Sequence, residues 1–383
     1  MTYSSLESEY LISLIRCAIK EEKAPPVPKE LDWQELFILS KKHQVYSVIL
    51  PVIDLNSIPQ QQAQELQFYS QNELLRMIAT NSELCEIEKE LEKNNIKFML
   101  LKGGVIRNLY PLQKMRQMSD YDILYDASAR EALLNIMKNR DYSLVSWSEN
   151  SDDFSKKPFY TFEFHRELFF KEHGFCLDFS NVWENASVDE NNPCKYYMSE
   201  SDLYLHTVAH MYKHYVLGGF GIRFLADTYL ILTKLKASLD NDYIAKRLSE
   251  LNLTHFERVV RELTLAVFDS KEYTEEQIDF LNNIMKFGIY GDYNAGVKVY
   301  YDEFIEKKGN VKFPVFRYYL SKAFPDRDFM KRTYPVLDSK PYLIGYYYVR
   351  RFFEKLINCR TYIFNNIKIL RQMNKEENEK SKR

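Results

Sequence analysis

The sequence lacks the marks of a secreted, membrane-spanning or disulfide-bonded protein. Its cysteines are few, odd in number and without a Cys-x-x-Cys pair, which argues against a disulfide framework and against a cysteine zinc site. They are Cys17, Cys85, Cys176, Cys194 and Cys359. The N-terminus carries acidic residues where a signal peptide needs a basic start and an apolar run. No apolar stretch approaches the roughly 20 residues that span a bilayer. We therefore expect a cytoplasmic protein with no membrane span.

The sequence also lacks a large net charge. The formal net charge is −2 over 383 residues, so the whole chain carries no signature of nucleic-acid binding. Hydrophobic residues make up 45% and aromatic residues 15% of the chain, which excludes an intrinsically disordered protein. The length allows two or three domains with a large core.

Three regions differ in their hydrophobic pattern. Residues 1–94 have helical spacing of apolar side chains, and the stretch from Pro59 to Asn94 predicts one long helix. Residues 95–198 contain short apolar or alternating runs separated by glycine and asparagine, which is typical of an α/β unit. Residues 199–383 return to helical spacing. We predict an α+β fold in which a small mixed-sheet core is flanked by helical N-terminal and C-terminal regions.

The central region and its borders yield specific expectations for secondary structure. A helix capped by Ser199 begins the C-terminal region, and the last helix is expected from about Tyr342 to Met373. Within the core we expect strands at 96–101, 120–125 and 142–147, short helices at 103–110 and 127–139, and a hairpin formed by 159–170 and 175–179.

The tetrapeptide Ser119-Asp120-Tyr121-Asp122 predicts a cation site. Residues i and i+2 of a strand point to the same face, so Asp120 and Asp122 would project together while Tyr121 and Ile123 enter the core. Two adjacent carboxylates repel each other, and a divalent cation removes that repulsion. Magnesium favours one or two protein carboxylates together with substrate phosphates. Because Asp-x-Asp is a frequent pattern, the alternative is a solvated strand end.

The turn Lys102-Gly103-Gly104 lies between an expected strand and an expected helix. Glycines in such a turn let the backbone approach phosphates, and the helix N-terminus attracts anions. Lys102, Arg107 and Arg116 can add positive charge. The alternative is a tight turn in which the glycines serve geometry alone.

Together these motifs resemble a known family. The segment LLKGGVIRNLYPLQKMRQMSDYDILY is similar to the uncharacterised nucleotidyltransferases of the DNA polymerase beta-like superfamily, in which Lys-Gly, Tyr-Pro, Arg and an Asp-x-Asp strand follow one another. It also resembles the Gly-Gly…Arg…Asp-x-Asp arrangement of CCA-adding enzymes. The segments HMYKHYVLGGFGIRFLADTYL and FPDRDFMKRTYPVLDSKPYLIGYYYVRR look like later parts of the same family. The resemblance implies that Gly103 and Gly104 bind a triphosphate and that Asp120 and Asp122 bind Mg²⁺ or Mn²⁺.

The resemblance also implies a third carboxylate on a later strand. In FEFHRELF, Glu163, His165 and Glu167 share one strand face, and Glu163 is the expected third metal ligand or general base. Asp178 is the competing candidate. A glutamate here departs from the aspartate more usual in the superfamily, which favours weaker or absent activity. His165 is expected to orient a carboxylate or contact a phosphate, and the alternative is a half-buried histidine paired with an acid.

The helix after the core carries histidines at every fourth position, which place them on one face. They are His206, His210 and His214. Zinc binding is one interpretation, but no carboxylate in this helix supplies an obvious further ligand. We instead expect His210, Lys213 and His214 to face the cleft and meet the nucleotide or acceptor, and the family resemblance of this segment adds Arg223 and Asp227 as candidates. The alternative for Arg223 is an ordinary ion pair with Asp227, four residues away.

The sequence therefore predicts a metal-dependent nucleotidyltransferase. It would move a nucleoside monophosphate from an NTP, with ATP as the expected nucleotide, to an acceptor that is a small molecule, a protein or a tRNA. The alternative is a catalytically inactive nucleotide-binding or interaction module on the same fold. The expected catalytic and metal-binding residues are Asp120, Asp122 and Glu163. The expected nucleotide-binding residues are Lys102, Gly103, Gly104, Arg116, Ser119, His165, Lys213, His214 and Arg223.

Overall fold

The chain is seen here as a computed structural model. It describes residues 5–148, 150–169 and 177–289, and beyond these 291, 297, 301, 304–305, 314–327, 330–331, 334 and 336–358.

Seven strands of the described chain form one mixed sheet, in the order β3-β4-β5-β2-β1-β7-β6. The pairs β2–β5 and β1–β7 are parallel, and the other neighbours are antiparallel. The predicted α+β class is confirmed. The strands are β1 (Phe98–Leu100), β2 (Tyr121–Tyr125), β3 (Ser143–Trp147), β4 (Ser151–Lys156), β5 (Tyr160–His165), β6 (Ser187–Val188) and β7 (Lys195–Tyr197).

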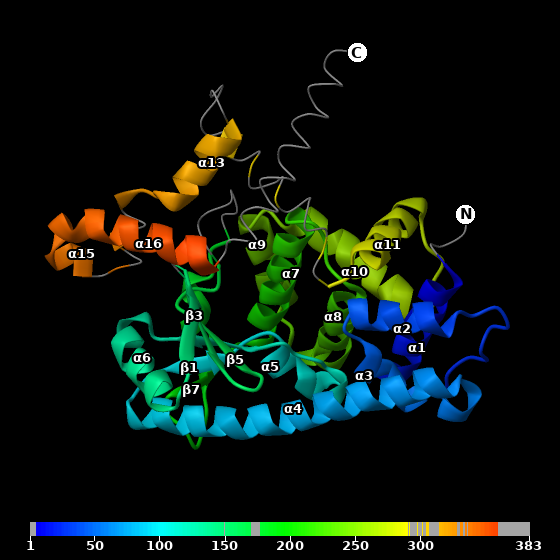
Figure 1. Cartoon of the computed structure of the whole chain (residues 1–383). Helices are drawn as coiled ribbons and strands as arrows, with labels where there is room; N and C mark the ends of the chain where they lie inside the picture. Colours follow the sequence, from blue (N-terminus) through cyan, green and yellow to red (C-terminus); the bar gives the residue numbers. More distant parts are fainter. Residues whose placement is uncertain are drawn as a thin grey trace, which may run out of the picture.

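One face of the sheet is covered by α4 (Gln60–Lys93) and α6 (Arg130–Asn139), and α4 runs along the bottom of the view in Figure 1. Alternation along β2 sends Tyr121 and Ile123 into this core, where they are 3% and 0% exposed. The residue between them, Asp122, therefore faces the opposite side. The single long helix expected from Pro59 to Asn94 is confirmed.

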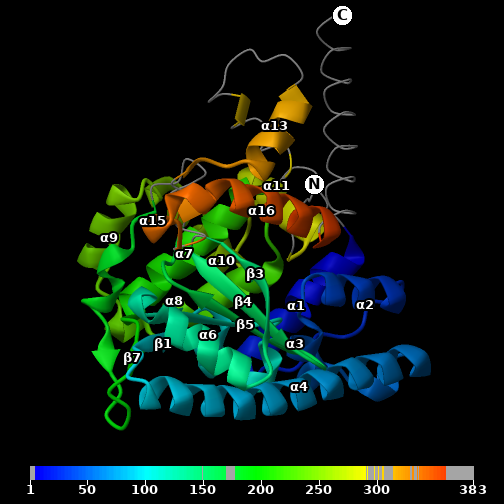
Figure 2. The same cartoon turned by 60° about the vertical axis from the view of Figure 1, so that its left-hand side comes forward.

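The other side of the sheet faces α7 (Glu200–Val216) and α8 (Ile222–Lys234). These helices share their core with α10 (Thr254–Phe268) and with the N-terminal helices, which lie beside them in Figures 1 and 2. Helices that precede and follow the sheet in sequence thus form one core, while α4 packs on the sheet through Leu84, Ile87 and Leu91 and on the N-terminal helices through Leu66. The N-terminal helices are α1 (Leu6–Lys20), α2 (Trp33–Lys42) and α3 (Tyr46–Ile49).

The remaining helices follow the sequence pattern closely. Ser199 caps α7, because its Oγ accepts from the backbone N–H of Asp202 at 3.1 Å. None of the described helices combines the length and the apolar character needed to cross a bilayer. The other α-helices are α5 (Gly103–Ile106), α9 (Asn241–Glu250), α11 (Glu275–Phe287), α13 (Pro314–Ala323), α15 (Val336–Ser339) and α16 (Ile344–Asn358). The part of the last expected helix that follows 358 lies outside the described residues.

The expected hairpin is wrong. The antiparallel partner of β5 is β4, which precedes it, and residues 177–179 are not a strand. The rest of the expected second arm, 175–176, lies outside the described residues. Sequence pattern misses β4 because its central side chain is a buried acid: Asp152 is 0% exposed and pairs with Arg130 at 2.7 Å and with Arg166. A polar strand neutralised from other elements has no apolar alternation to detect.

Candidate active site

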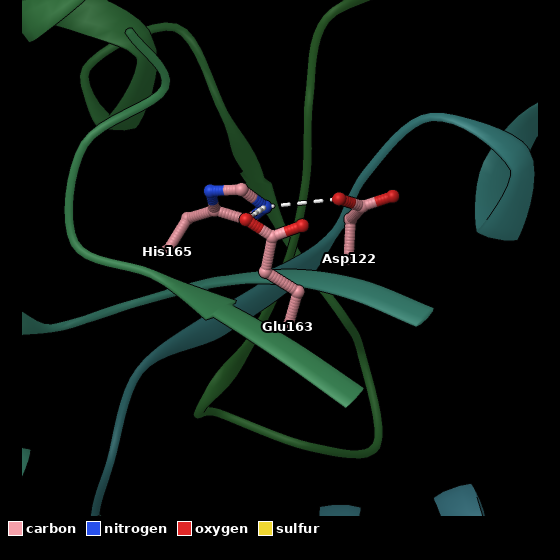
Figure 3. A group of neighbouring side chains, drawn as sticks. All are labelled: Asp122, Glu163 and His165. Atoms are coloured by element: carbon pink, nitrogen blue, oxygen red, sulfur yellow. Dashed lines mark hydrogen bonds and ion pairs between the residues drawn. The ribbon is translucent and has the colours of Figure 1, made fainter. Parts of the chain in front are cut away.

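Two acids and a histidine meet on the sheet face opposite α4. In the parallel β2–β5 pair, Asp122 stands beside Glu163 and Leu124 beside His165. His165 Nε2 lies 2.9 Å from Asp122 Oδ1 and 3.5 Å from Glu163 Oε1. Figure 3 shows the three side chains turned toward one another from the two strands. One potential ligand atom of each lies within 4.8 Å of the others, so sheet register alone assembles a set of cation donors.

Lys102 is the residue between β1 and α5, and its ammonium reaches this cluster. Its Nζ lies 2.6 Å from Asp122 Oδ1. The backbone turns at Lys102, whose φ of 49° is left-handed, and not at the glycines that follow. A Cβ at Gly103 would stand 3.0 Å from Met118 Cγ, a close contact that a small shift of the Met118 side chain would relieve. A Cβ at Gly104 would meet ordinary contacts of 3.6 Å.

Electrostatics separates the two aspartates of the Asp-x-Asp motif. Burial disfavours the ionised form of Asp122, but Lys102 and His165 outweigh it and hold the pKa of Asp122 well below its ordinary range. Asp120 lies in the turn just before β2. Burial, and then the negative charge of Asp122, raise the pKa of Asp120 to about 6. Asp122 thus stays ionised, whereas Asp120 is the acid of the pair that holds a proton more readily.

A cavity of about 430 Å³ separates the acidic cluster from α7. The α7 wall includes His206, His210 and His214, which are kept neutral because burial lowers their pKa values, to about 3 for His206 and about 4 for His214. His210 Nε2 and His214 Nε2 are 3.2 Å apart. On the same wall, burial and the nearby Lys102 lower the pKa of Lys213, which has no carboxylate partner within the described chain.

Two arginines also line the cavity, and both are engaged. Arg116 donates to Asp227 from Nε, at 2.8 Å to Oδ1 and 3.1 Å to Oδ2, and from Nη2 at 2.7 Å to Oδ2, and it donates to the carbonyl of Gln117 at 2.6 Å. Arg223 donates to the carbonyl of Gln117 at 3.1 Å and to the Gln44 side chain. Asp227, the alternative partner considered for Arg223, is thus bound on both oxygens by Arg116.

A family model described as uncharacterised nucleotidyltransferase matches residues 29–269. The chain belongs to this family of nucleotidyltransferases. The matched region contains every strand of the described sheet together with α7 and α8. No curated protein and no solved structure matches the chain.

The chain brings nearly all of the residues singled out from sequence to one cavity. Gly104 and Arg107 are exceptions, because both line a separate hollow on the other side of the turn. Asp120 lines the cavity but lies outside the close group of donor atoms found among the described residues. The residues on the cavity wall are Lys102, Gly103, Arg116, Ser119, Asp120, Asp122, Glu163, His165, Lys213, His214 and Arg223. Their individual roles stay predictions.

Glu163 and Asp178, the two candidates for the third carboxylate, lie in different places relative to the cavity. Glu163 lines the cavity and pairs in register with Asp122. Asp178 is exposed and absent from the cavity wall, and its carboxylate accepts from the backbone N–H of Ser180 at 2.9 Å. The geometry therefore favours Glu163 as the third carboxylate.

Asp153 on β4 is a residue that sequence reasoning missed. It stands opposite Glu163 in the antiparallel β4–β5 pair, so Asp122, Glu163 and Asp153 form one row across three strands. Burial, and then the charge of Glu163, raise the pKa of Asp153 to about 6. The available signal was local: an acid directly before Phe154 repeats the acid-then-apolar order of Asp122 and Glu163 on their strands.

The donor set of the cavity fits a divalent cation. Carboxylate oxygens suit Mg²⁺ and Mn²⁺, and an imidazole nitrogen suits transition ions. Asp122, Glu163 and His165 supply both kinds of atom from two rigid strands. The family implies an NTP as substrate, and the cavity has room for one, since small-molecule sites commonly enclose about 300–1,000 Å³.

Proposed function

We propose that the chain transfers a nucleoside monophosphate from an NTP, with ATP as the expected nucleotide, to a hydroxyl-bearing acceptor. The observation that carries this proposal is the pairing of two walls across one cavity. Asp122 and Glu163 stand side by side on the sheet, and Lys213 and His214 face them from α7. An acidic wall suits a divalent cation, and the Lys213 ammonium, with the neutral His214 imidazole beside it, suits the triphosphate that the cation accompanies.

Two lysines are the expected triphosphate ligands. Lys213 has no acidic partner in the part of the chain that the structure describes, so a phosphate oxygen would supply the counter-charge it lacks. Lys102 bonds Asp122 at 2.6 Å and can turn to a phosphate oxygen when that carboxylate takes another partner.

In the proposed reaction the acceptor hydroxyl attacks the α-phosphorus in line and pyrophosphate leaves from the opposite side. Asp122 and Glu163, with Asp120 beside them, would hold a divalent cation, Mg²⁺ or Mn²⁺, which when bound stabilises negative charge on the transferring phosphoryl group. The chain's own part is to fix the triphosphate between Lys102 and Lys213 and to keep the reacting groups in a confined cavity.

The experiment uses NTPs labelled at either the α- or the γ-phosphate, incubated with the full chain, a divalent cation and a cell extract. The extract is fractionated into small molecules, proteins and tRNA. We expect label from the α-phosphate, and none from the γ-phosphate, in one fraction. Asp122→Asn should abolish transfer, whereas the matched change Asp178→Asn, at an exposed acid outside the cavity, should leave it intact.

Three outcomes contradict the proposal. Transfer of γ-label would indicate a kinase. Equal labelling by Asp122→Asn and wild type would show that the site around Asp122 is not the active site. NTP binding measured by calorimetry, with no transfer to any fraction, would favour the alternative of an inactive nucleotide-binding module on the same fold.

A further inference from the structure

We propose that His165 is itself a ligand of the active-site cation and that the site therefore prefers a first-row transition ion to Mg²⁺. The inference rests on the proposed function only for the presence of a cation between Asp122 and Glu163. It adds a nitrogen donor to a centre otherwise made of carboxylates, and it identifies the class of ion that the centre selects.

The first argument is the spacing of the donor atoms. Two ligands held about 2.1 Å from one ion lie about 3.0 Å apart at a right angle and about 3.4 Å apart at a tetrahedral angle. His165 Nε2 is 2.9 Å from Asp122 Oδ1 and 3.5 Å from Glu163 Oε1. Both separations match those of neighbouring ligands around one ion. Both histidine separations already have this spacing on adjacent strands, and all three donor atoms lie within 4.8 Å of one another.

The second argument concerns which nitrogen of His165 faces the acids. Nε2 contacts both carboxylates, whereas Nδ1 is buried without a hydrogen-bond partner in the described residues. His165 is 5% exposed, so water does not reach the ring freely. The imidazole is thus oriented by Nε2 alone. In the structure Nε2 can donate its hydrogen to the ionised Asp122, and a cation between the carboxylates would replace that hydrogen and bind the Nε2 lone pair.

The third argument is selectivity. Magnesium strongly favours oxygen ligands in octahedral geometry and keeps several waters, so a fixed imidazole offers it little. Affinity of a mixed nitrogen and oxygen site rises along the first-row divalent ions from Mn²⁺ toward Zn²⁺ and Cu²⁺. Mn²⁺ also suits carboxylates, which makes it a suitable probe for a site with two carboxylates and one imidazole.

The other cavity histidines do not share this position. His206, His210 and His214 line the opposite wall on α7, and the group of close donors in the described chain includes none of them. His210 provides a matched control, because it is a buried histidine of the same cavity that the proposal leaves without a contact to the cation.

The test is electron spin-echo spectroscopy of Mn²⁺ bound to the full chain without nucleotide or acceptor. We expect a ¹⁴N coupling from a directly bound imidazole in wild type and in His210→Asn, and its loss in His165→Asn. In His165→Asn the dissociation constant for Mn²⁺, measured by continuous-wave electron paramagnetic resonance, should rise by at least about 10-fold. The dissociation constant for Mg²⁺, measured by competition with Mn²⁺, should change much less.

Wild-type protein grown with ¹⁵N-histidine tests the inference without any substitution. The ¹⁴N signal should be replaced by a ¹⁵N signal, even if His165→Asn does not fold. Bound Mn²⁺ without a histidine coupling in wild type, or a coupling that persists in folded His165→Asn, would overturn the inference. Transfer from a labelled NTP at limiting Mn²⁺ that is unaffected by His165→Asn would overturn it while leaving the proposed function in place. Absence of transfer together with an intact ¹⁴N coupling would overturn the proposed function and leave the cation contact of His165 in place.

Discussion

The Arg116–Asp227 pair is expected to stabilise the fold and not to bind phosphate, although the sequence motif places Arg116 among the phosphate ligands. The two side chains are 7% and 3% exposed. Both oxygens of Asp227 are bound by Arg116, at 2.8 and 2.7 Å, and Tyr110 donates to one of them at 2.8 Å. This network ties the segment before β2 to α8, which carries part of the cavity wall. The guanidinium is therefore committed to a neighbouring helix.

The expected magnitude follows from breaking a buried charge pair on one side only. Asp227→Asn keeps the shape but removes the counter-charge, so the Arg116 guanidinium stays buried and uncompensated. Such changes typically cost about 3–5 kcal/mol, a large part of the 5–15 kcal/mol by which a domain is usually stable. The double change Arg116→Met with Asp227→Leu removes both charges and should cost far less than the sum of the two single changes.

The assay is chemical denaturation of wild type, Arg116→Met, Asp227→Leu and the double variant, followed by circular dichroism. We expect a coupling free energy of about 3 kcal/mol or more between the two positions. Costs that simply add, with a coupling below about 1 kcal/mol, would refute the reasoning. So would an Arg116→Met variant that keeps wild-type stability but binds NTP much more weakly, since that combination belongs to a phosphate ligand.

Three further predictions concern single residues. His43 is 0% exposed, and burial lowers its pKa to about 4. Between that value and the ordinary value of about 6.5 the unfolded state binds more protons, so the free energy of unfolding should fall by up to about 3 kcal/mol as the pH drops through this window. His43→Gln should flatten that pH dependence in denaturation curves. Lys102→Met removes the ammonium that competes for Asp122, so Mn²⁺ alone should bind about 10-fold more tightly in electron paramagnetic resonance titrations. The same variant should bind NTP more weakly in calorimetry. Gly103→Ala places a Cβ 3.0 Å from the flexible Met118 side chain and should cost only about 1 kcal/mol in thermal or chemical unfolding, whereas a loss of folding would contradict it.

The sequence predicted the elements of the site better than their pairing. Strict alternation in β2 was enough to assign Tyr121 to the core and Asp122 to the opposite face, because a buried face fixes strand orientation. The histidine spacing of α7 likewise predicted a cavity-facing helix, since a period of four keeps side chains on one face. These features depend on neighbours within one element.

The features that sequence reasoning missed depend on contacts between elements. Nothing in the local pattern around Lys102 shows that its ammonium reaches Asp122, twenty residues later and on the next strand of the sheet. The partner of Asp227 could not be read from helical spacing, because Arg116 competes with Arg223 from a distant loop. Such pairings are set by tertiary packing. Contacts between distant elements leave no regular spacing of residues in a single sequence.

The missed strand β4 also explains how the donor set keeps its geometry. The cluster exists only because Asp122 stands beside Glu163, and a shift of the β2–β5 register by one residue would turn one donor into the hydrophobic core. Strand β5 is held on its other side by β4, whose buried Asp152 bonds Arg130 in α6 and Arg166 just after β5. The ion pairs anchor β4 to elements on both sides of the strand. A cation at Asp122 and Glu163 would then be bound by atoms whose spacing is fixed by the sheet before it arrives, which favours selection of ions by ligand type over adjustment of the site to each ion.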